Sequence, residues 1–373
     1  MQQYLRTWRY KIPSWIVRAG NKLGIVSAPK APIGFVIERA DWAIRRVGES
    51  IRNEIEKEKK DLIITTTRPE KLVNKVVHFG SQYMWLAWGS HMSQNNKYVT
   101  SFFHGKPEDG PETERHIEEF LKSVKRLKKI IVSASIIEQR LINWGVPREK
   151  VTRIPIGVDT KLFVPPSQLQ RESSRKKLGL SAKSIVIGSF QKDGVGWGDG
   201  MEPKRIKGPD IFVETVRQLK KDLPVSVLLT GPARGYVKHE LERNGIPWVH
   251  TYVENYSDLI SCYHALDFYL ITSREEGGPM GLMESMAAGV PVVSTPVGMG
   301  TDLIKDGFSG GLVETIDAAE LANKIRSLLE NSENLPNIKE EALKIVESCS
   351  WSNVAKAHLQ EVYLPLMKEM GNR

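Results

Sequence analysis

Short runs rich in β-branched residues alternate with helical patterns along most of the chain, and this alternation restricts the fold more than any other feature. The runs predicted to be strands are Ile33–Ile37, Leu62–Thr66, Val76–Phe79, Tyr98–Phe103, Ile130–Ser133, Ile185–Gly188, Val225–Thr230, Trp248–Tyr252, Phe268–Thr272 and Val290–Ser294. The helical patterns include Trp42–Lys59, Glu112–Leu127, Pro209–Leu219, Tyr256–Ala265 and Met280–Ala288. This alternation is typical of parallel sheets covered by helices, so the sequence predicts an α/β fold.

The pattern is interrupted once, near the middle of the chain. The segment Ile154–Asp159 contains a Pro and a Gly, and Pro165-Pro166 follows it, which is typical of a connection between domains. The 373 residues are also too many for one ordinary domain. We therefore expect one domain over residues 1–163 and a second over 164–351. The segment from Trp351 to Met370 is predicted to be a long amphipathic helix, and we expect residues 352–373 to return to the first domain.

Composition limits the cellular setting and the kind of partner. The two cysteines, Cys262 and Cys349, favour a reducing compartment, and no apolar run is long enough to cross a membrane. We therefore expect a cytoplasmic protein. The net charge of +9 indicates an anionic partner. Aromatic residues alternate with basic ones in residues 1–30, as at an anionic membrane surface, and a second basic cluster lies at residues 122–129. The alternative is a solvated face; nucleic acid is not expected, because no known binding module is present.

The segment Ser273–Ser294 carries the strongest chemical signal. A predicted strand ends in the loop Gly277-Gly278-Pro279, and a helix is predicted to begin at Met280. In an open parallel sheet this loop lies at the carboxyl ends of the strands, where ligands bind. Glycines let a ligand approach the backbone, and the N–H groups of a helix start favour a phosphate. The segment therefore predicts a site for a phosphorylated ligand.

Two carboxylates, Glu276 and Glu284, lie eight residues apart in this segment. Carboxylates accept hydrogen bonds from sugar hydroxyls. We expect Glu276 to bind a transferred sugar and Glu284 to bind a ribose, with a diphosphate between them. Loss of Glu276 is then expected to leave the affinity for a sugar-free nucleoside diphosphate nearly unchanged. The alternative is a solvated loop acid and an ordinary helix acid.

Glu276 and Glu284, followed by Ala288-Gly289-Val290-Pro291, resemble the donor motif of the retaining GT-B glycosyltransferases usually called family 4. Other segments match that family in order: His104-Gly105, Val132-Ser133, Gly145-Val146-Pro147, Ile154–Asp159, Lys207-Gly208, Gly298 and Asp306-Gly307. The resemblance implies two Rossmann-like domains that face a central cleft. It also implies retaining transfer from a nucleotide sugar to a saccharide or lipid-linked acceptor, without a metal or other cofactor.

The same resemblance assigns roles to individual residues. His104 and Glu276 are the implied catalytic residues. The implied donor-binding residues are Lys207, Gly277, Gly278, Pro279, Met280 and Glu284. His104 has a structural alternative, since a histidine after an apolar strand is often part of a core, and His78 is interpreted as structural.

The sequence departs from the family at two places. The family has an Arg shortly after the first strand of the second domain, whereas this chain has Gly188-Ser189-Phe190 followed by a glycine-rich segment. Lys192, Lys204 and Arg205 are the candidates for the second phosphate cation, and a solvated loop charge is the alternative for each. The usual Gly-Gly loop of the first domain is replaced by residues 38–42. A nucleotide-sugar epimerase, a phosphorylase and a catalytically degenerate membrane-docking scaffold remain alternative functions, and the base, sugar and acceptor stay open.

Overall fold

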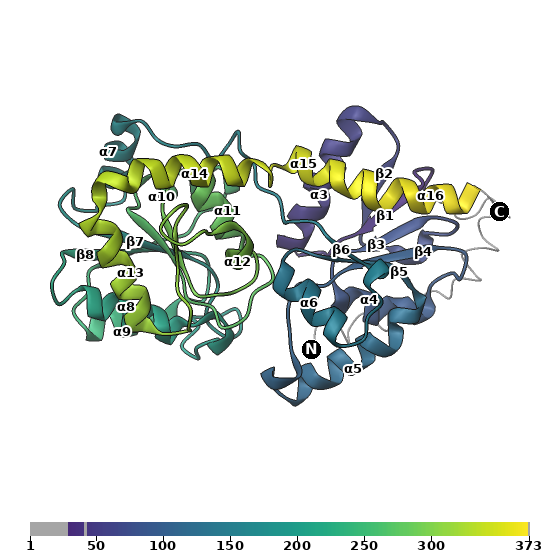
Figure 1. Cartoon of the computed structure of the whole chain (residues 1–373), viewed down its shortest axis with the longest axis horizontal. Helices are drawn as coiled ribbons and strands as arrows, with labels where there is room; N and C mark the ends of the chain where they lie inside the picture. The colour runs from purple at the N-terminus through teal and green to yellow at the C-terminus, as the bar shows by residue number, and fades with distance from the viewer. Residues whose placement is uncertain (1–28, 41–42, 372–373) are drawn as a thin grey trace. The chain divides into compact units, whose positions relative to one another are not determined.

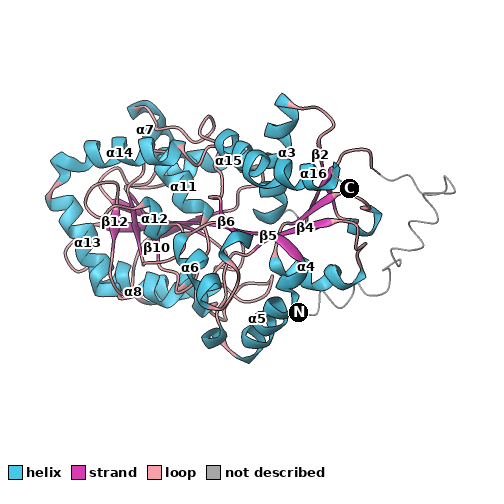
Figure 2. Cartoon of the chain, turned by 45° about the vertical axis from the view of Figure 1, so that its right-hand side comes forward, coloured by secondary structure: helices cyan, strands magenta, loops and turns pink. Residues whose placement is uncertain are grey.

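The computed structural model describes residues 29–40 and 43–371 and divides the chain into two compact units. Unit 1 comprises residues up to Ile156 together with those from Trp351 onward, and unit 2 comprises Gly157–Ser350. Each unit consists of a six-stranded parallel sheet with helices on both faces (Figures 1 and 2). The predicted α/β fold is therefore confirmed.

Unit 1 contains a sheet of strand order β2-β1-β3-β4-β5-β6. Its strands are β1 (Ile33–Val36), β2 (Ile63–Thr66), β3 (Val76–Phe79), β4 (Lys97–Ser101), β5 (Leu127–Val132) and β6 (Val151–Arg153). Its main helices are α3 (Ala43–Glu58), α4 (Gln82–Trp88), α5 (Pro111–Ser123), α6 (Ser135–Asn143), α15 (Trp351–Ala357) and α16 (Leu364–Gly371). Strands β1, β3 and β4 are wholly buried, as expected for apolar runs in a parallel sheet that is covered on both faces.

Unit 2 has the strand order β12-β11-β10-β7-β8-β9. Its strands are β7 (Ile185–Phe190), β8 (Val225–Thr230), β9 (Trp248–Thr251), β10 (Phe268–Ile271), β11 (Val292–Ser294) and β12 (Gly311–Leu312). Its helices include α7 (Gln168–Lys177), α8 (Pro209–Leu219), α9 (Gly235–Arg243), α10 (Leu259–His264), α11 (Met280–Ala287), α12 (Gly300–Leu303), α13 (Ala318–Glu330) and α14 (Leu335–Glu347). Helices α8, α9 and α13 cover one face of the sheet, and α10, α11 and α14 lie on the other (Figure 1).

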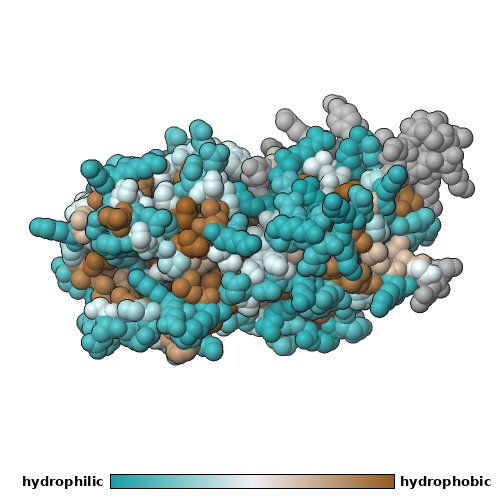
Figure 3. Space-filling model, turned by 90° about the horizontal axis from the view of Figure 1, so that it is seen from above, coloured by the Kyte–Doolittle hydropathy of each residue, from teal (hydrophilic) through white to brown (hydrophobic). Residues whose placement is uncertain are grey.

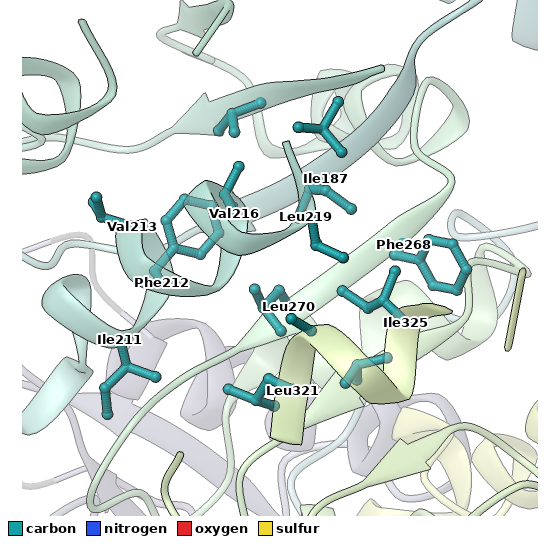
Figure 4. Close-up of a cluster of buried hydrophobic side chains, with 14 of the residues drawn as sticks. Ile187, Ile211, Phe212, Val213, Val216, Leu219, Phe268, Leu270, Leu321 and Ile325 are labelled. Carbon is teal, nitrogen blue, oxygen red and sulfur yellow. The ribbon is translucent and has the colours of Figure 1, made fainter. Parts of the chain in front are cut away.

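The core of unit 2 lies between its sheet and the α8–α13 layer. Phe212, Val216 and Leu219 of α8 meet Leu321 and Ile325 of α13 over the strands, and all five side chains are fully buried (Figure 4). Helix α13 begins at a cap, because the Asp317 carboxylate accepts hydrogen bonds from the N–H groups of Ala319 and Glu320 at 2.7 and 3.0 Å. The 3.6-residue apolar spacing of both helices thus predicts the buried faces that the structure shows.

The boundary between the units lies earlier than the sequence pattern predicts. It falls at Ile156/Gly157 rather than after residue 163. The Val158 N–H donates to the Cys349 carbonyl at 2.9 Å, which joins the connecting segment to unit 2. The Phe163 ring lies against Tyr256 and Tyr263, with ring centroids 5.4 and 5.6 Å apart. The two prolines therefore lie inside unit 2.

The C-terminal segment belongs to unit 1, as predicted, but it is not one uniform α-helix. A π-helical turn, His358–Tyr363, separates α15 from α16, and α15 packs on α3. The Tyr363 hydroxyl lies 2.7 Å from Nδ1 of His78, whose Nε2 lies 3.0 Å from the Ser101 hydroxyl. Burial holds the pKa of His78 well below its ordinary value. His78 is thus a core residue that joins β3 to the end of the chain.

Candidate functional site

The order of the strands reverses at a different point in each sheet. In unit 2 the order reverses between β7 and β10, which is the Rossmann order; in unit 1 it reverses between β1 and β3, as in flavodoxin-like sheets. Ligands of open parallel sheets bind beside such a point, at the carboxyl ends of the strands. In unit 2 the loops that follow β7 and β10 meet there. Lys207 comes from the first loop and Glu276 from the second.

Gly208 is the residue that brings these two loops together. Its φ is +64°, and a Cβ atom at this position would lie 1.8 Å from the carbonyl oxygen of Thr272. The Thr272 hydroxyl donates to the Gly208 carbonyl at 2.9 Å. Only glycine combines this conformation with so close an approach. Lys207 therefore lies beside the carboxyl end of β10.

The ammonium group of Lys207 contacts Oε1 of Glu276 in an ion pair. The same carboxylate oxygen lies 3.3 Å from the Ser273 hydroxyl. The two charged side chains are 21% and 9% exposed, so bulk water screens the pair only in part. The structure thus joins two predicted site residues that are 69 positions apart.

The loop Gly277–Pro279 leads into α11 and is fixed by the segment after β11. Gly298, with a φ of +47°, lies so close that a Cβ atom there would be 2.4 Å from the Gly277 carbonyl oxygen. The Met299 N–H donates to the same oxygen at 3.0 Å. Within the described chain no side chain caps α11, and its first turn, from Met280, contains no acidic residue. Its amino end therefore has the polarity that attracts an anion.

Glu284 lies in the second turn of α11 and is 4% exposed. The Tyr263 hydroxyl donates to its Oε2 at 2.7 Å, and the Tyr256 hydroxyl contacts Oε1. Burial, and then the negative charge of Glu284, raise the pKa of Tyr263 well above its ordinary value, so this hydroxyl stays a donor. The sequence analysis missed both tyrosines. Their seven-residue spacing, two helical turns, was the available signal.

The glycine-rich segment after β7 forms a short hairpin. Gly194 and Pro203 form an antiparallel bridge, and the Val195 N–H donates to the Glu202 carbonyl at 2.8 Å. Lys192, a predicted donor-binding residue, lies at the base of this hairpin with its ammonium group 3.9 Å from the centre of the Trp197 ring. It therefore lies near the site, but its contact is with an aromatic ring.

The other candidate cations have distinct surroundings. Arg205 forms an ion pair with Asp210 at 2.9 Å and is 64% exposed. Arg274 binds the same carboxylate through two hydrogen bonds of 2.9 and 2.7 Å. The pKa of Lys204 is lowered by desolvation and by the nearby positive charge of Lys207. Lys204 is therefore electrostatically coupled to Lys207, whereas Arg205 already has a carboxylate partner.

A buried arginine from a distant part of the sequence lies at the end of β7. Arg234 follows β8, is 1% exposed, and lies 3.0 Å from the Asp193 carboxylate. Its guanidinium donates to the carbonyl groups of Ser189 and Thr230 at 2.6 and 2.9 Å. Sequence reasoning missed this residue because 45 positions separate it from Ser189. Arg234 thus fixes the start of the hairpin and has little surface to offer a ligand.

His104 lies in unit 1, in the loop after β4. The Gln82 side chain donates to the His104 carbonyl at 3.1 Å, and Arg140 donates to the Gly105 carbonyl at 3.2 Å. His116 lies nearby and stacks on Tyr83 with ring centroids 4.1 Å apart. Burial, and then the charge of His104, lower the pKa of His116 to about 4. The loop is thus held at the carboxyl edge of the unit 1 sheet.

Several predicted features lie outside these sites. The basic residues 1–28 and Asp41-Trp42 are outside the described residues. In the second basic cluster, Arg126 lies over the rings of Trp85 and Tyr98, and Lys129 donates to the Glu149 carbonyl at 2.8 Å. The surface in view in Figure 3 is mostly hydrophilic.

Residues 29–40 and 43–371 contain neither a metal-binding cluster nor a membrane-spanning helix. Within those ranges, no three His, Cys, Asp or Glu side chains are grouped so that they could hold a metal ion. Over the same described part of the chain, no helix has the length and apolarity needed to span a membrane. Metal independence of the reaction stays a prediction.

Residues 202–345 match the family described as glycosyl transferases group 1. A curated relative, the D-inositol 3-phosphate glycosyltransferase of Corynebacterium urealyticum, is 26% identical over 292 residues, which cover 74% of this chain and 65% of the relative. The lipopolysaccharide core biosynthesis mannosyltransferase LpsB of Rhizobium meliloti is 30% identical over 167 residues, or 43% of each chain. The chain thus spans less than two thirds of the length of these relatives.

Solved structures support the fold. Anabaena Alr3699/HepE, in complex with UDP and glucose, superposes with a TM-score of 0.72 at 17% identity, over 89% of this chain and 99% of the other. The sucrose-phosphate synthase of Thermosynechococcus elongatus gives a TM-score of 0.71 at 17% identity, over 91% and 100%. The chain therefore has the GT-B fold, and its residues 202–345 are similar to the glycosyl transferases group 1 family.

Proposed function

We propose that the chain is a retaining, metal-independent glycosyltransferase that moves a sugar from a nucleotide-sugar donor to a saccharide or lipid-linked acceptor. One observation carries the proposal. Lys207, Glu276 and the uncapped start of α11 meet at the reversal point of the unit 2 sheet, with Glu284 in the second turn of that helix. This arrangement offers positive charge for a diphosphate and carboxylates for sugar hydroxyls.

In the proposed reaction the bond between the anomeric carbon and the diphosphate oxygen breaks, and the leaving diphosphate keeps the electron pair. Lys207 and the N–H groups of Met280 and Gly281 stabilise this growing negative charge. The acceptor oxygen forms the new bond to the anomeric carbon on the same face of the sugar, and its proton passes to the leaving phosphate. No covalent enzyme intermediate is needed in this scheme.

The two carboxylates bind different parts of the donor in this proposal. Glu276 accepts hydrogen bonds from hydroxyls of the transferred sugar, and Glu284, held by Tyr256 and Tyr263, accepts them from the ribose. His104 faces the reacting sugar, as the family resemblance implies. Similarity to a D-inositol 3-phosphate glycosyltransferase and to a lipopolysaccharide core biosynthesis mannosyltransferase supports polyol and saccharide acceptors.

A thermal-shift screen against nucleotide sugars tests the donor site. A ligand at one hundred times its Kd adds about 2.7 kcal/mol of stability, which is easily measured. The best donor is then tested for transfer to saccharide acceptors, with the anomeric configuration of the product read by NMR. No stabilisation by any nucleotide sugar, or a product of inverted configuration, would contradict the proposal.

We further propose a cytoplasmic location at the inner face of a membrane, which the charge pattern of residues 1–30 supports. Deletion of these residues is expected to reduce sedimentation with vesicles that contain anionic lipid. A deletion variant that sediments as well as the full-length chain would exclude this role.

A further inference from the structure

The ion pair between Lys207 and Glu276 has a consequence for ligand selection, and this inference rests on the proposed function. We infer that Glu276 makes the site prefer the intact nucleotide sugar to the sugar-free nucleoside diphosphate, because it competes with phosphate for Lys207. Glu276 is thus a specificity-determining residue as well as a sugar ligand.

The local charges show why the pair forms without a ligand. Lys192, Lys204 and Lys207 form a group of positive charges: desolvation lowers the pKa of Lys204 most, and the positive charges of Lys207 and Lys192 lower it further. Glu276 opposes this effect on Lys204 and contacts Lys207 directly. The carboxylate therefore acts as an internal counter-ion where a diphosphate is expected to bind.

A bound diphosphate changes the position of this carboxylate. The phosphate and Glu276 are both anions, so the phosphate weakens the contact between Glu276 and Lys207. Because the Glu276 side chain is only 9% exposed, water replaces the lost contact poorly. The carboxylate is then left near a second negative charge with fewer hydrogen bonds.

The sugar of an intact donor removes this penalty. Its hydroxyl groups donate hydrogen bonds to the carboxylate that has been displaced from Lys207. A sugar-free diphosphate offers no such donors. The same residue therefore favours binding of the donor and release of the product after transfer.

The ion pair is not needed to bring the two loops together. The close approach of Gly208 to Thr272, the hydrogen bond from the Thr272 hydroxyl to the Gly208 carbonyl, and the hydrogen bond from the Arg274 N–H to the Ile206 carbonyl at 2.8 Å already join them. Replacement of Glu276 by Gln keeps the size of the side chain. The variant is therefore expected to fold, and thermal unfolding without ligand checks this.

The experiment is calorimetric titration of wild-type protein and Glu276→Gln. The ligands are the nucleoside diphosphate that best stabilises the wild type among UDP, GDP and ADP, and its glucose, mannose and N-acetylglucosamine conjugates. We expect Glu276→Gln to bind the sugar-free diphosphate about tenfold more tightly, equivalent to about 1.4 kcal/mol. Its affinity for the preferred conjugate is expected to stay equal or fall, so the preference for the conjugate over the sugar-free diphosphate is expected to drop by at least about tenfold.

Two variants separate this effect from a general change of charge. Glu275→Gln removes the same charge from the adjacent, equally buried position of the loop and is expected to change diphosphate affinity by less than about twofold. When Lys207 is replaced by Met, Glu276→Gln is expected to increase diphosphate affinity much less, because no ammonium group remains that the carboxylate could withhold from the phosphate. Equal tightening by Glu275→Gln and Glu276→Gln would overturn the inference.

The two proposals can fail separately. If the wild type binds the diphosphate and Glu276→Gln binds it no better, the competition is refuted while the proposed function stands. If the wild type binds none of the nucleotides, the proposed function fails and the inference fails with it.

Discussion

Replacement of Tyr263 by Phe tests how Glu284 is held. The change removes one hydroxyl that donates to the Glu284 carboxylate at 2.7 Å and keeps the ring among Phe163, Phe190 and Tyr269. A hydrogen bond to a charged group contributes about 1.5–3 kcal/mol, and Glu284 is too buried for water to replace it fully. We therefore expect the free energy of unfolding to fall by about 2 kcal/mol.

The same variant is expected to bind nucleoside diphosphate about fivefold more weakly, because the carboxylate that accepts the ribose hydroxyls is less well fixed. Urea denaturation gives the stability, and calorimetric titration gives the affinity. Tyr252→Phe is the matched control, since this tyrosine is 69% exposed and its replacement is expected to cost less than about 0.5 kcal/mol.

Equal stability of the Tyr263→Phe and Tyr252→Phe variants would refute the reasoning, because the buried hydroxyl would then contribute nothing to Glu284. The double variant with Glu284→Gln provides a further check. If the Tyr263 hydroxyl acts through the Glu284 carboxylate, the effects of the two substitutions on the free energy of unfolding are not additive.

Four further predictions concern other parts of the chain. The folded-state pKa of His116, about 4, lies below the ordinary value of 6.5, so its contribution to stability is complete above pH 6.5 and is lost as the pH falls toward 4. Because His116 is only half-buried, solvent screens the effect and the loss is expected to be well under about 3 kcal/mol; pH-dependent denaturation of His116→Asn is expected to show a flatter profile between pH 6.5 and 4. Gly208→Ala is expected to lower the melting temperature and abolish diphosphate binding, because its Cβ would clash with the Thr272 carbonyl; a stable, ligand-binding variant would contradict this. His104→Ala is expected to reduce the transfer rate and leave diphosphate affinity unchanged, and a rate equal to that of the wild type would remove His104 from the mechanism. Transfer activity is expected to survive EDTA, whereas a loss that manganese or magnesium restores would exclude a metal-independent reaction.

Much of the fold could be predicted because the buried strands are continuous apolar runs. The predicted run Val225–Thr230 coincides with β8, and Val76–Phe79 coincides with β3. Strands β6 and β12 were missed: β12 has only two residues, and β6 has one buried apolar residue, whereas the equally short β11 lies in the apolar run Val290–Ser294. The order of the strands could not be predicted either, because it depends on which neighbour each strand pairs with.

The site was predictable where one segment carries it and not where distant residues complete it. One motif contains Glu276, Glu284 and the loop between them. The pair Lys207-Gly208 occurs in the order along the chain that the family resemblance implies. The side chains that contact these residues, such as Tyr263 beside Glu284, are distant in the sequence and are brought near only by folding. The ion pair also changes one expectation: from sequence alone, loss of Glu276 is expected to leave diphosphate affinity unchanged, whereas a carboxylate already bound to Lys207 predicts an increase.

The division of unit 1 between the two ends of the chain determines the order in which the protein can be completed on the ribosome. Unit 2 is continuous, whereas unit 1 needs α15 and Tyr363 to cover α3 and to pair with His78. Chain elongation at about 5–20 residues per second means that the nascent unit 1 waits about 10–40 s while the roughly 190 residues of unit 2 are made. The half that is synthesised first is therefore the half that finishes folding last, since the face of α3 that α15 covers has no partner until the last residues are made.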